Sequence, residues 1–287
     1  MKSYKNTKEL IDIIQNKGIA IDDSDYVKEK IEKYGFYNVI NTYREPFRRN
    51  GSYLPNVNFN EIFALFEFDL NIKSLLLKYT LEIEIIIKNR LSDCLGNNYG
   101  LEDYLNIDNF NRNNKTDILI IELINKINDE IKYSSSKHDA ISHYLNNYGY
   151  IPPYVLVKIL SIGTLSKYYQ LMKQDDQQEI SKYFKITDKD LKSLLKNLTF
   201  IRNICAHSDR LYCYRNIITL GKQLLPTTYK FRKNINDLYT VILAMEKILP
   251  KEKYDILISE FNNELNNLEK QLKSISIDRI KGIIGVQ

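Results

Sequence analysis

LKSLLKNLTFIRNICAHSDRLYCYR, residues 191–215, opens as an amphipathic helix. Its apolar residues recur at steps of three and four, so they share one helix face: Leu191, Leu194, Leu195, Leu198, Ile201 and Cys205. At about 100° per residue, Asn203, His207 and Arg210 form a second stripe roughly opposite that face. Arg202 lies on the flank between the two stripes. The stretch therefore predicts a helix anchored by one face and exposing a polar group on the other.

The polar group suits phosphate chemistry. A guanidinium binds phosphate oxygens through two donors, and an imidazole can take up or release a proton near neutral pH. The spacing between Arg202 and His207, written R-x4-H, also arises by chance. The alternative interpretation is that both are ordinary surface or capping residues.

Composition indicates a globular chain with one large domain or two small ones. The chain has 287 residues, of which 44% are apolar and 27% are charged. The formal net charge of +5 permits nucleic-acid binding through local patches but does not establish it. The first residues are polar, and the longest apolar run, near residues 81–87, is interrupted by acids. We therefore expect neither a signal peptide nor a membrane span.

The cysteines and histidines do not form a recognisable metal site. Cys94, Cys205 and Cys213 include no CxxC pair, and the histidines are too scattered for zinc. Cys94 and Cys205 fall on apolar helix faces, so we expect free thiols and a reducing, cytoplasmic location.

The rest of the chain predicts an all-α fold. Periodicity and capping residues place helices at about 7–17, 24–35, 60–95, 115–133, 153–161, 164–172, 175–184, 187–206, 232–249 and 251–274, with a short helix ending near 146. The long stretch 60–95 is expected to break near Asn71, and 101–116 to form a polar loop. No repeat or strand alternation is present. We expect an N-terminal helical appendage (1–55), a main helical domain (56–275) and an unassigned tail (276–287).

Two short stretches concentrate basic residues. Arg44, Arg48 and Arg49 surround Pro46, and residues 229–233 (YKFRK) interleave aromatic and basic side chains. Each is either a solvated turn or first helical turn, or a place where RNA phosphates are neutralised and bases stack.

Five pieces of the chain, in this order, resemble the Abi (abortive infection) proteins of bacteria, within the HEPN superfamily of helical ribonucleases. They are NKGIAIDD (16–23), YGFYNVINTYREPF (34–47), FEFDLNIKSLLLKYTLEIEIIIKNRLSDCLGNNYG (66–100), IPPYVLVKILSIGTLSKYYQL (151–171) and LKNLTFIRNICAHSDRL (195–211). The family often has Trp where this chain has Tyr154 and Tyr212, and Asn where it has Cys213. These departures concern the surroundings of the R-x4-H motif and not the motif itself.

The resemblance implies a HEPN-like helical bundle and a metal-independent endoribonuclease without a cofactor. RNA supplies its own nucleophile, the 2′-hydroxyl, and the products would be a 2′,3′-cyclic phosphate and a 5′-hydroxyl. His207 would move the proton, and Arg202 would offset charge developing on the phosphate. Asn203 would orient the imidazole or bind a phosphate oxygen. The residues expected to contact RNA are Arg210, Arg44, Arg48, Arg49, Lys230, Arg232 and Lys233.

The resemblance also implies partners. Because one chain carries one motif, a homodimer could bring two His207 residues together across a twofold axis. A toxin-like enzyme of this kind needs an antitoxin, either a small RNA or a protein. Two alternatives stay open, a non-catalytic RNA-binding protein on the HEPN scaffold and a purely structural helical module.

Overall fold

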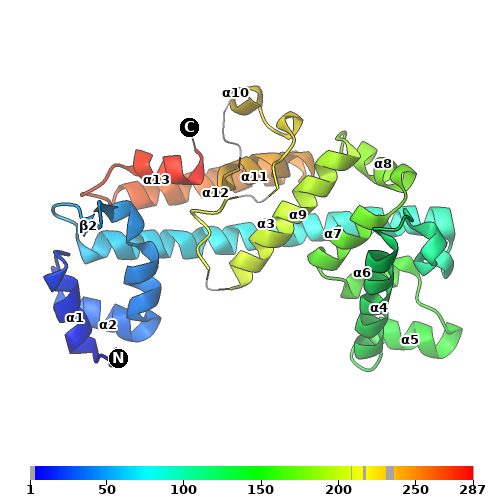
Figure 1. Cartoon of the computed structure of the whole chain (residues 1–287), viewed down its shortest axis with the longest axis horizontal. Helices are drawn as coiled ribbons and strands as arrows, with labels where there is room; N and C mark the ends of the chain where they lie inside the picture. The colour runs from blue at the N-terminus through cyan, green and yellow to red at the C-terminus, as the bar shows by residue number, and fades with distance from the viewer. Residues whose placement is uncertain (1–3, 208, 216–217, 231–235, 287) are drawn as a thin grey trace.

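A single long helix forms the spine of the protein. The computed structural model describes residues 4–207, 209–215, 218–230 and 236–286. Its architecture is almost entirely helical, which confirms the predicted all-α class. Helix α3 (Phe59–Tyr99) runs the length of the molecule, with α1 and α2 at one end and α4 to α8 at the other (Figure 1).

Helix α3 is continuous over 41 residues, roughly 60 Å at 1.5 Å per residue. It begins at Asn58, whose side chain accepts from the Asn60 amide at 2.9 Å, while Glu61 accepts from the Asn58 amide at 3.2 Å. The predicted break near Asn71 is wrong. The Asn71 amide nitrogen donates to Glu264 at 2.8 Å, so its polar group is satisfied by a neighbouring helix without interrupting α3.

The N-terminal helices pack on the beginning of α3 through aromatic side chains. Helices α1 (Thr7–Asn16) and α2 (Ser24–Tyr34) confirm the two helices predicted there. The rings of Tyr26 and Tyr34 lie 6.0 and 5.7 Å from the Phe63 ring. Between α1 and α2 the backbone of Ala20 pairs with Asn58 in an isolated β-bridge.

The segment after α2 contains a small hairpin that the sequence did not reveal. A π-helical turn (Tyr37–Asn41) and a 3-10 turn (Glu45–Phe47) precede β1 (Arg48–Arg49) and β2 (Ser52–Tyr53). The two strands pair antiparallel. Asn50 and Gly51, with φ of 50° and 86°, form the turn, and an Asn-Gly pair is well suited to positive φ.

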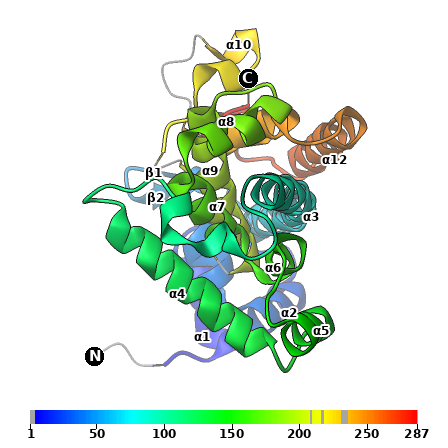
Figure 2. The same ribbon diagram turned by 90° about the vertical axis from the view of Figure 1, so that its right-hand side faces the viewer.

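The far end of α3 is covered by short helices and one polar linker. These helices are α4 (Asp117–Ser134), α5 (Asp139–Tyr148), α6 (Pro153–Ile159), α7 (Ile162–Leu171) and α8 (Gln174–Tyr183). Seen along α3, α6 lies against one side of the spine and α12 against another (Figure 2).

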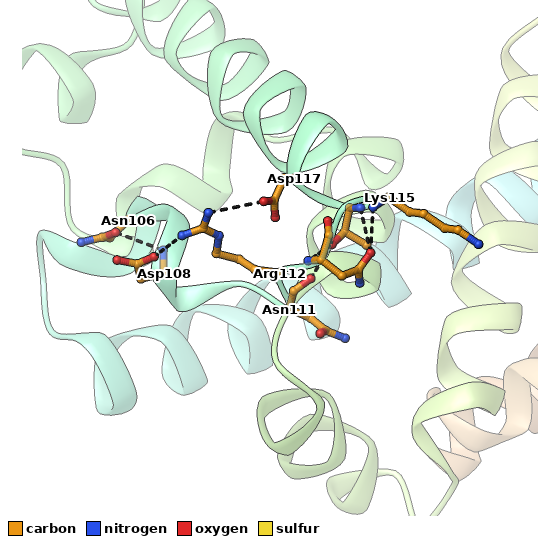
Figure 3. A network of polar contacts seen from close by, with 8 residues as sticks. Asn106, Asp108, Asn111, Arg112, Lys115 and Asp117 are labelled. Atoms are coloured by element: carbon orange, nitrogen blue, oxygen red, sulfur yellow. Dashed lines mark hydrogen bonds and ion pairs between the residues drawn. The ribbon is translucent and has the colours of Figure 1, made fainter.

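The linker before α4 is more ordered than a simple loop. It holds two 3-10 turns, Asp103–Leu105 and Ile107–Asn109. Arg112 donates to Asp108 at 2.6 Å and to Asp117 at 3.3 Å, which joins the second turn to the first turn of α4 (Figure 3).

The C-terminal part differs from the prediction in its helix bounds. The described elements are a 3-10 turn (Lys222–Leu224), α10 (Thr227–Lys230), α11 (Leu238–Ala244), a 3-10 turn (Met245–Lys247), α12 (Lys251–Glu269) and α13 (Ile277–Ile284). Of the helix predicted at 232–249, residues 232–235 lie outside the described residues, and Asn236 and Asp237 precede the helix, since Asp237 is the N-cap of α11. Helix α12 ends at Glu269, short of the predicted end at 274, and the backbone amides of Lys273 and Ser274 donate to Glu61.

Residues left unassigned by the sequence form a packed helix, α13, whose Ile277, Ile280 and Ile284 are buried. The proposed division at residues 55 and 275 stays a prediction. Within the described ranges, no helix is both long and apolar enough to cross a membrane.

Candidate functional site around the R-x4-H motif

Helix α9 (Asp188–Ala206) carries the motif and crosses α3 (Figure 1). Thr187 caps it as predicted, accepting from the Asp190 amide at 3.1 Å. The predicted apolar face is confirmed, since its leucines and Ile201 are at most 1% exposed. Packing of this face fixes the orientation of the helix and therefore the direction in which its polar side points.

The helix ends at Ala206, so the predicted polar stripe does not continue through His207 and Arg210. His207 is the C-cap residue, with extended φ and ψ of −122° and 175°. Arg210 lies in the loop beyond. The prediction of one helical stripe from Asn203 to Arg210 is therefore wrong. The chain leaves the helix because the backbone that follows is bound by a side chain on α3.

That side chain is Asp69, which sequence reasoning missed. It is fully buried, and its carboxylate accepts hydrogen bonds from the Leu211 amide at 3.1 Å and the Tyr212 amide at 2.6 Å. It also accepts from the Tyr43 hydroxyl at 2.7 Å and pairs with Lys73 at 3.1 Å. One carboxylate thus joins three segments that are far apart in the sequence. A buried charge with this many donors is well satisfied.

The groups around Asp69 lie in an environment whose burial disfavours further negative charge. Burial raises the pKa of the Cys205 thiol to about 12, although the Lys73 charge opposes this shift. Burial and the Asp69 carboxylate raise the pKa of Tyr43 well above its usual value. Tyr43 stacks on Tyr212 with ring centroids 5.8 Å apart. Tyr212 is thus an interior residue.

A second buried polar residue, Asn197 of α9, forms hydrogen bonds with the segment that follows the motif. The amide nitrogen of Asn197 donates to the Ser193 carbonyl at 2.9 Å and the Ile218 carbonyl at 3.0 Å. Its oxygen accepts from the Tyr214 hydroxyl at 3.2 Å. Residues on both sides of the loop are therefore fixed to the helix that carries the motif.

The side chains of the motif take no part in the polar contacts that the described residues make with one another. Asn203 and His207 are exposed, and Arg202 is half-buried. Among the described residues, none of the three side chains makes a hydrogen bond or ion pair, and the buried Nε of Arg202 has no partner. An unpaired buried guanidinium nitrogen is unusual. A donor aimed at an anionic ligand would account for it.

The Arg210 side chain forms a hydrogen bond that connects two distant segments of the fold. Its guanidinium donates to the Thr42 carbonyl oxygen at 2.9 Å, 168 residues away in the sequence. Thr42 precedes Tyr43, so this bond reinforces the junction made by Asp69. The Arg210 side chain remains exposed.

Residues 29–213 match the family model of the Abi-like proteins, a span that covers more than half of the chain. The chain belongs to this family. Membership associates it with abortive infection, a form of phage defence. The match includes both the R-x4-H motif and Asp69. Comparisons with curated proteins and with solved structures find no match.

The predicted basic residues of this Abi-like protein fall into two groups. Arg44 and Arg48 are half-buried and Arg49 is exposed, and all three follow Thr42 on the segment that Arg210 contacts. The structure therefore brings this group close to the loop after the motif.

The second basic group lies only partly within the described residues. Tyr229 is 8% exposed, so its own ring is not available to a base, while Phe231 lies outside the described residues and the stacking alternative stays a prediction. Lys230 ends α10 and is half-buried. Arg232 and Lys233 lie outside the described residues.

The described residues contain one group of possible metal ligands, Cys94, Asp176 and Glu179, within 4.8 Å of one another. The Asn98 amide donates to both carboxylates, at 2.9 and 3.0 Å. Burial raises the pKa of the Cys94 thiol to about 12, which opposes the thiolate form that metals bind. The group lies about 37 Å along α3 from Asp69 at 1.5 Å per residue, too far to serve the motif. We interpret it as structural.

Proposed function

We propose that this Abi-like protein is a HEPN-type, metal-independent endoribonuclease that acts as a toxin in abortive infection. The observation that carries the proposal is the contrast at the end of α9. The backbone after the motif is bound by buried Asp69, whereas Arg202, Asn203 and His207 have no partner side chains in the part of the chain that the structure describes. Uncommitted polar groups on a rigid frame are what a phosphate-handling site requires.

The proposed reaction uses the RNA's own 2′-hydroxyl. A base removes its proton as the oxygen attacks the adjacent phosphorus, the bond from phosphorus to the 5′-oxygen breaks, and an acid protonates that oxygen. The products are a 2′,3′-cyclic phosphate and a 5′-hydroxyl. His207 is the proton-transfer group, and Arg202 stabilises negative charge on the phosphate oxygens. Asn203, one helical turn before His207, orients the imidazole or binds a phosphate oxygen.

A single chain offers only one histidine in the motif, whereas the reaction needs a base and an acid. We therefore propose a homodimer in which the exposed ends of two α9 helices meet across a twofold axis. The same histidine in each copy would take one of the two roles. A monomer at micromolar concentration with full cleavage activity would exclude this shared site.

A growth-arresting ribonuclease must be silent before infection. We propose that a small RNA or a protein antitoxin covers the exposed motif in healthy cells. We expect such a partner to co-purify with the intact protein. Its release should increase the rate of RNA cleavage.

The test is cleavage of end-labelled single-stranded and structured RNA in the presence of EDTA. The intact protein should yield cyclic-phosphate ends, and His207→Ala and Arg202→Ala should lose them by about 100-fold or more. His143→Ala is the matched control, because His143 is an exposed histidine on α5, away from the motif. Equal cleavage by His207→Ala and His143→Ala would exclude the assigned site.

A non-catalytic RNA-binding protein is the second candidate. The arginines around the hairpin favour it, because they can bind phosphates without any role for His207. RNA binding by all variants with no cleavage by the intact protein would select this candidate.

A further inference from the structure

The small hairpin encloses a basic pocket. It is a cavity of about 300 Å³, called here the hairpin pocket, and its lining residues are Lys17, Arg44, Arg48, Gly51, Ser52 and Tyr53. The volume is sufficient for one phosphate group with part of its sugar. The lining combines residues of the C-cap of α1 and of the hairpin, so the pocket depends on the packed fold.

The pocket carries an excess of positive charge. The Glu45 carboxylate partly offsets this charge. Its Oε1 atom pairs with Arg44 at 3.2 Å and with Arg48 at 3.1 Å. Two guanidinium groups of the lining, Arg44 and Arg48, therefore share one carboxylate oxygen, which leaves this pair with a net positive charge. Such a site attracts an anion.

Two polar atoms in the pocket residues have unmet hydrogen-bonding capacity. The Nε of Arg48 and the hydroxyl of Tyr53 are both buried, and neither has a hydrogen-bond partner among the described residues. The Arg48 guanidinium lies over the Tyr53 ring, 5.7 Å from its centroid. Leaving a buried polar atom unpaired costs about 1–3 kcal/mol, so a ligand that supplies an acceptor is favoured.

The frame of the pocket is fixed on two sides. Arg48 donates to the Gly51 carbonyl across the turn, and its own carbonyl accepts from Arg279 of α13 at 3.0 Å. On the other side Arg210 bonds to Thr42, two residues before Arg44. The segment that carries the pocket residues is therefore joined to the loop after the motif.

We infer that the hairpin pocket binds a phosphate group of the RNA strand, at a distance from the phosphate that is cleaved. The inference rests on the proposed function for its choice of RNA as the source of the phosphate. In this inference the side chains that contact the bound phosphate come from Arg44, Arg48, Lys17 and Tyr53. Arg49 is not among them, because it is exposed and does not line the pocket. Engagement of this phosphate would fix the register of the strand relative to His207.

The experiment measures RNA binding, so it does not depend on cleavage. Affinity for a labelled single-stranded RNA is determined at several salt concentrations, with all variants built on His207→Ala to keep the RNA intact. Arg44→Ala should weaken binding and reduce the slope of log affinity against log salt by about 0.7, the value for one single-strand phosphate. Tyr53→Phe keeps the ring under Arg48 and should also weaken binding, by several-fold.

Arg49→Ala is the matched control, since it removes the same charge from the same hairpin outside the pocket. Unchanged thermal unfolding of each variant shows that the fold is intact. An equal decrease in the salt slope for Arg44→Ala and Arg49→Ala would show that RNA responds to the overall charge of the hairpin and would contradict a specific pocket. Undiminished RNA binding by Arg44→Ala and Tyr53→Phe would also contradict it. Millimolar inorganic phosphate should compete with the RNA for binding to Arg49→Ala but not to Arg44→Ala, because the RNA phosphate and free phosphate would occupy the same pocket. Loss of RNA binding to Arg44→Ala with no competition by phosphate against Arg49→Ala would contradict a phosphate-binding pocket. RNA binding that depends on the pocket residues, without RNA cleavage by the intact protein, would refute the proposed ribonuclease activity and support phosphate binding by the hairpin pocket.

Discussion

The carboxylate of Asp69 accepts a 2.6 Å hydrogen bond from the backbone amide of Tyr212, 143 residues further along the chain. Through this bond the middle of the spine helix sets the path of the backbone just after the R-x4-H motif. The position of His207 therefore depends on a residue that itself contacts no solvent.

Replacing Asp69 by Ala should strongly destabilise the protein. The substitution leaves Lys73 as an unpaired buried charge and removes the acceptor of two amides and one hydroxyl. We expect a loss of about 3–5 kcal/mol in the free energy of unfolding, measured with urea. Asp93→Ala is the control, because Asp93 pairs with Arg90 on the exposed side of the same helix and should cost under about 1 kcal/mol. Equal losses would contradict the role of Asp69.

Replacing Tyr43 by Phe isolates one bond of this junction. The ring keeps its stacking on Tyr212, whereas the 2.7 Å hydrogen bond to Asp69 is lost. We expect a cost of about 1.5–3 kcal/mol in unfolding free energy, the range for a hydrogen bond to a charged group. Tyr43→Ala should cost more, about 3–5 kcal/mol, because it also leaves a cavity. A Phe variant as stable as the parent would show that the hydroxyl contributes nothing.

Local patterns made α9 predictable, because its cap and its apolar face lie within one continuous stretch. Asp69 was missed because its partners lie at Tyr43, Lys73 and residues 211–212, which no local pattern connects. A signal was nevertheless present. Asp69 and Lys73 stand at i and i+4 on the buried stripe of α3, where a charge pair is unusual.

The end of α9 illustrates a second limit. Helical spacing alone extended the polar stripe to Arg210, but the amides of residues 211 and 212 bind a distant carboxylate in preference to continuing the helix. The hairpin was missed for a different reason. Its strands have two residues each, too few for alternation, although Asn50-Gly51 is a recognised turn signal.

Glu61 should act as a second anchor of α3. Its buried carboxylate accepts from the Lys273 and Ser274 amides at 2.6 and 2.7 Å, which fixes the connection between α12 and α13. We expect Glu61→Ala to cost about 2–4 kcal/mol by thermal or urea unfolding, since several part-buried donors lose their acceptor. Glu67→Ala, at an exposed position on the same helix, should change stability little. A similar cost for both would show that helix composition, and not the anchor, is responsible.

Stability should fall in alkali because of the buried Cys94 thiol and the half-buried Cys205 thiol. Burial raises the pKa of both Cys94 and Cys205 to about 12, from the value near 9 of an exposed thiol. The folded state then binds more protons than the unfolded state between about pH 9 and pH 12. The stability contribution is present below pH 9 and is lost as pH rises through that window.

The measurement is urea unfolding at pH 8 and at pH 10, on the parent and on Cys94→Ala/Cys205→Ala. The parent should lose more stability over this interval than the double variant. Native Cys94 should also resist iodoacetamide at pH 8, because the thiolate is the reactive form. Rapid native labelling of Cys94 would be inconsistent with its burial and raised pKa.

Arg210 offers a direct choice between a structural and an RNA-binding role. Its bond to the Thr42 carbonyl predicts that Arg210→Ala loosens the junction between residues 37–43 and the loop after the motif. Amides in that segment should exchange with solvent about five-fold faster, the factor that ~1 kcal/mol gives. Arg215→Ala is the control, because Arg215 lies on the same loop but donates to the Ile283 carbonyl of α13 at 2.7 Å. Unchanged exchange, together with weaker RNA binding and a lower salt dependence, would assign Arg210 to RNA contact instead.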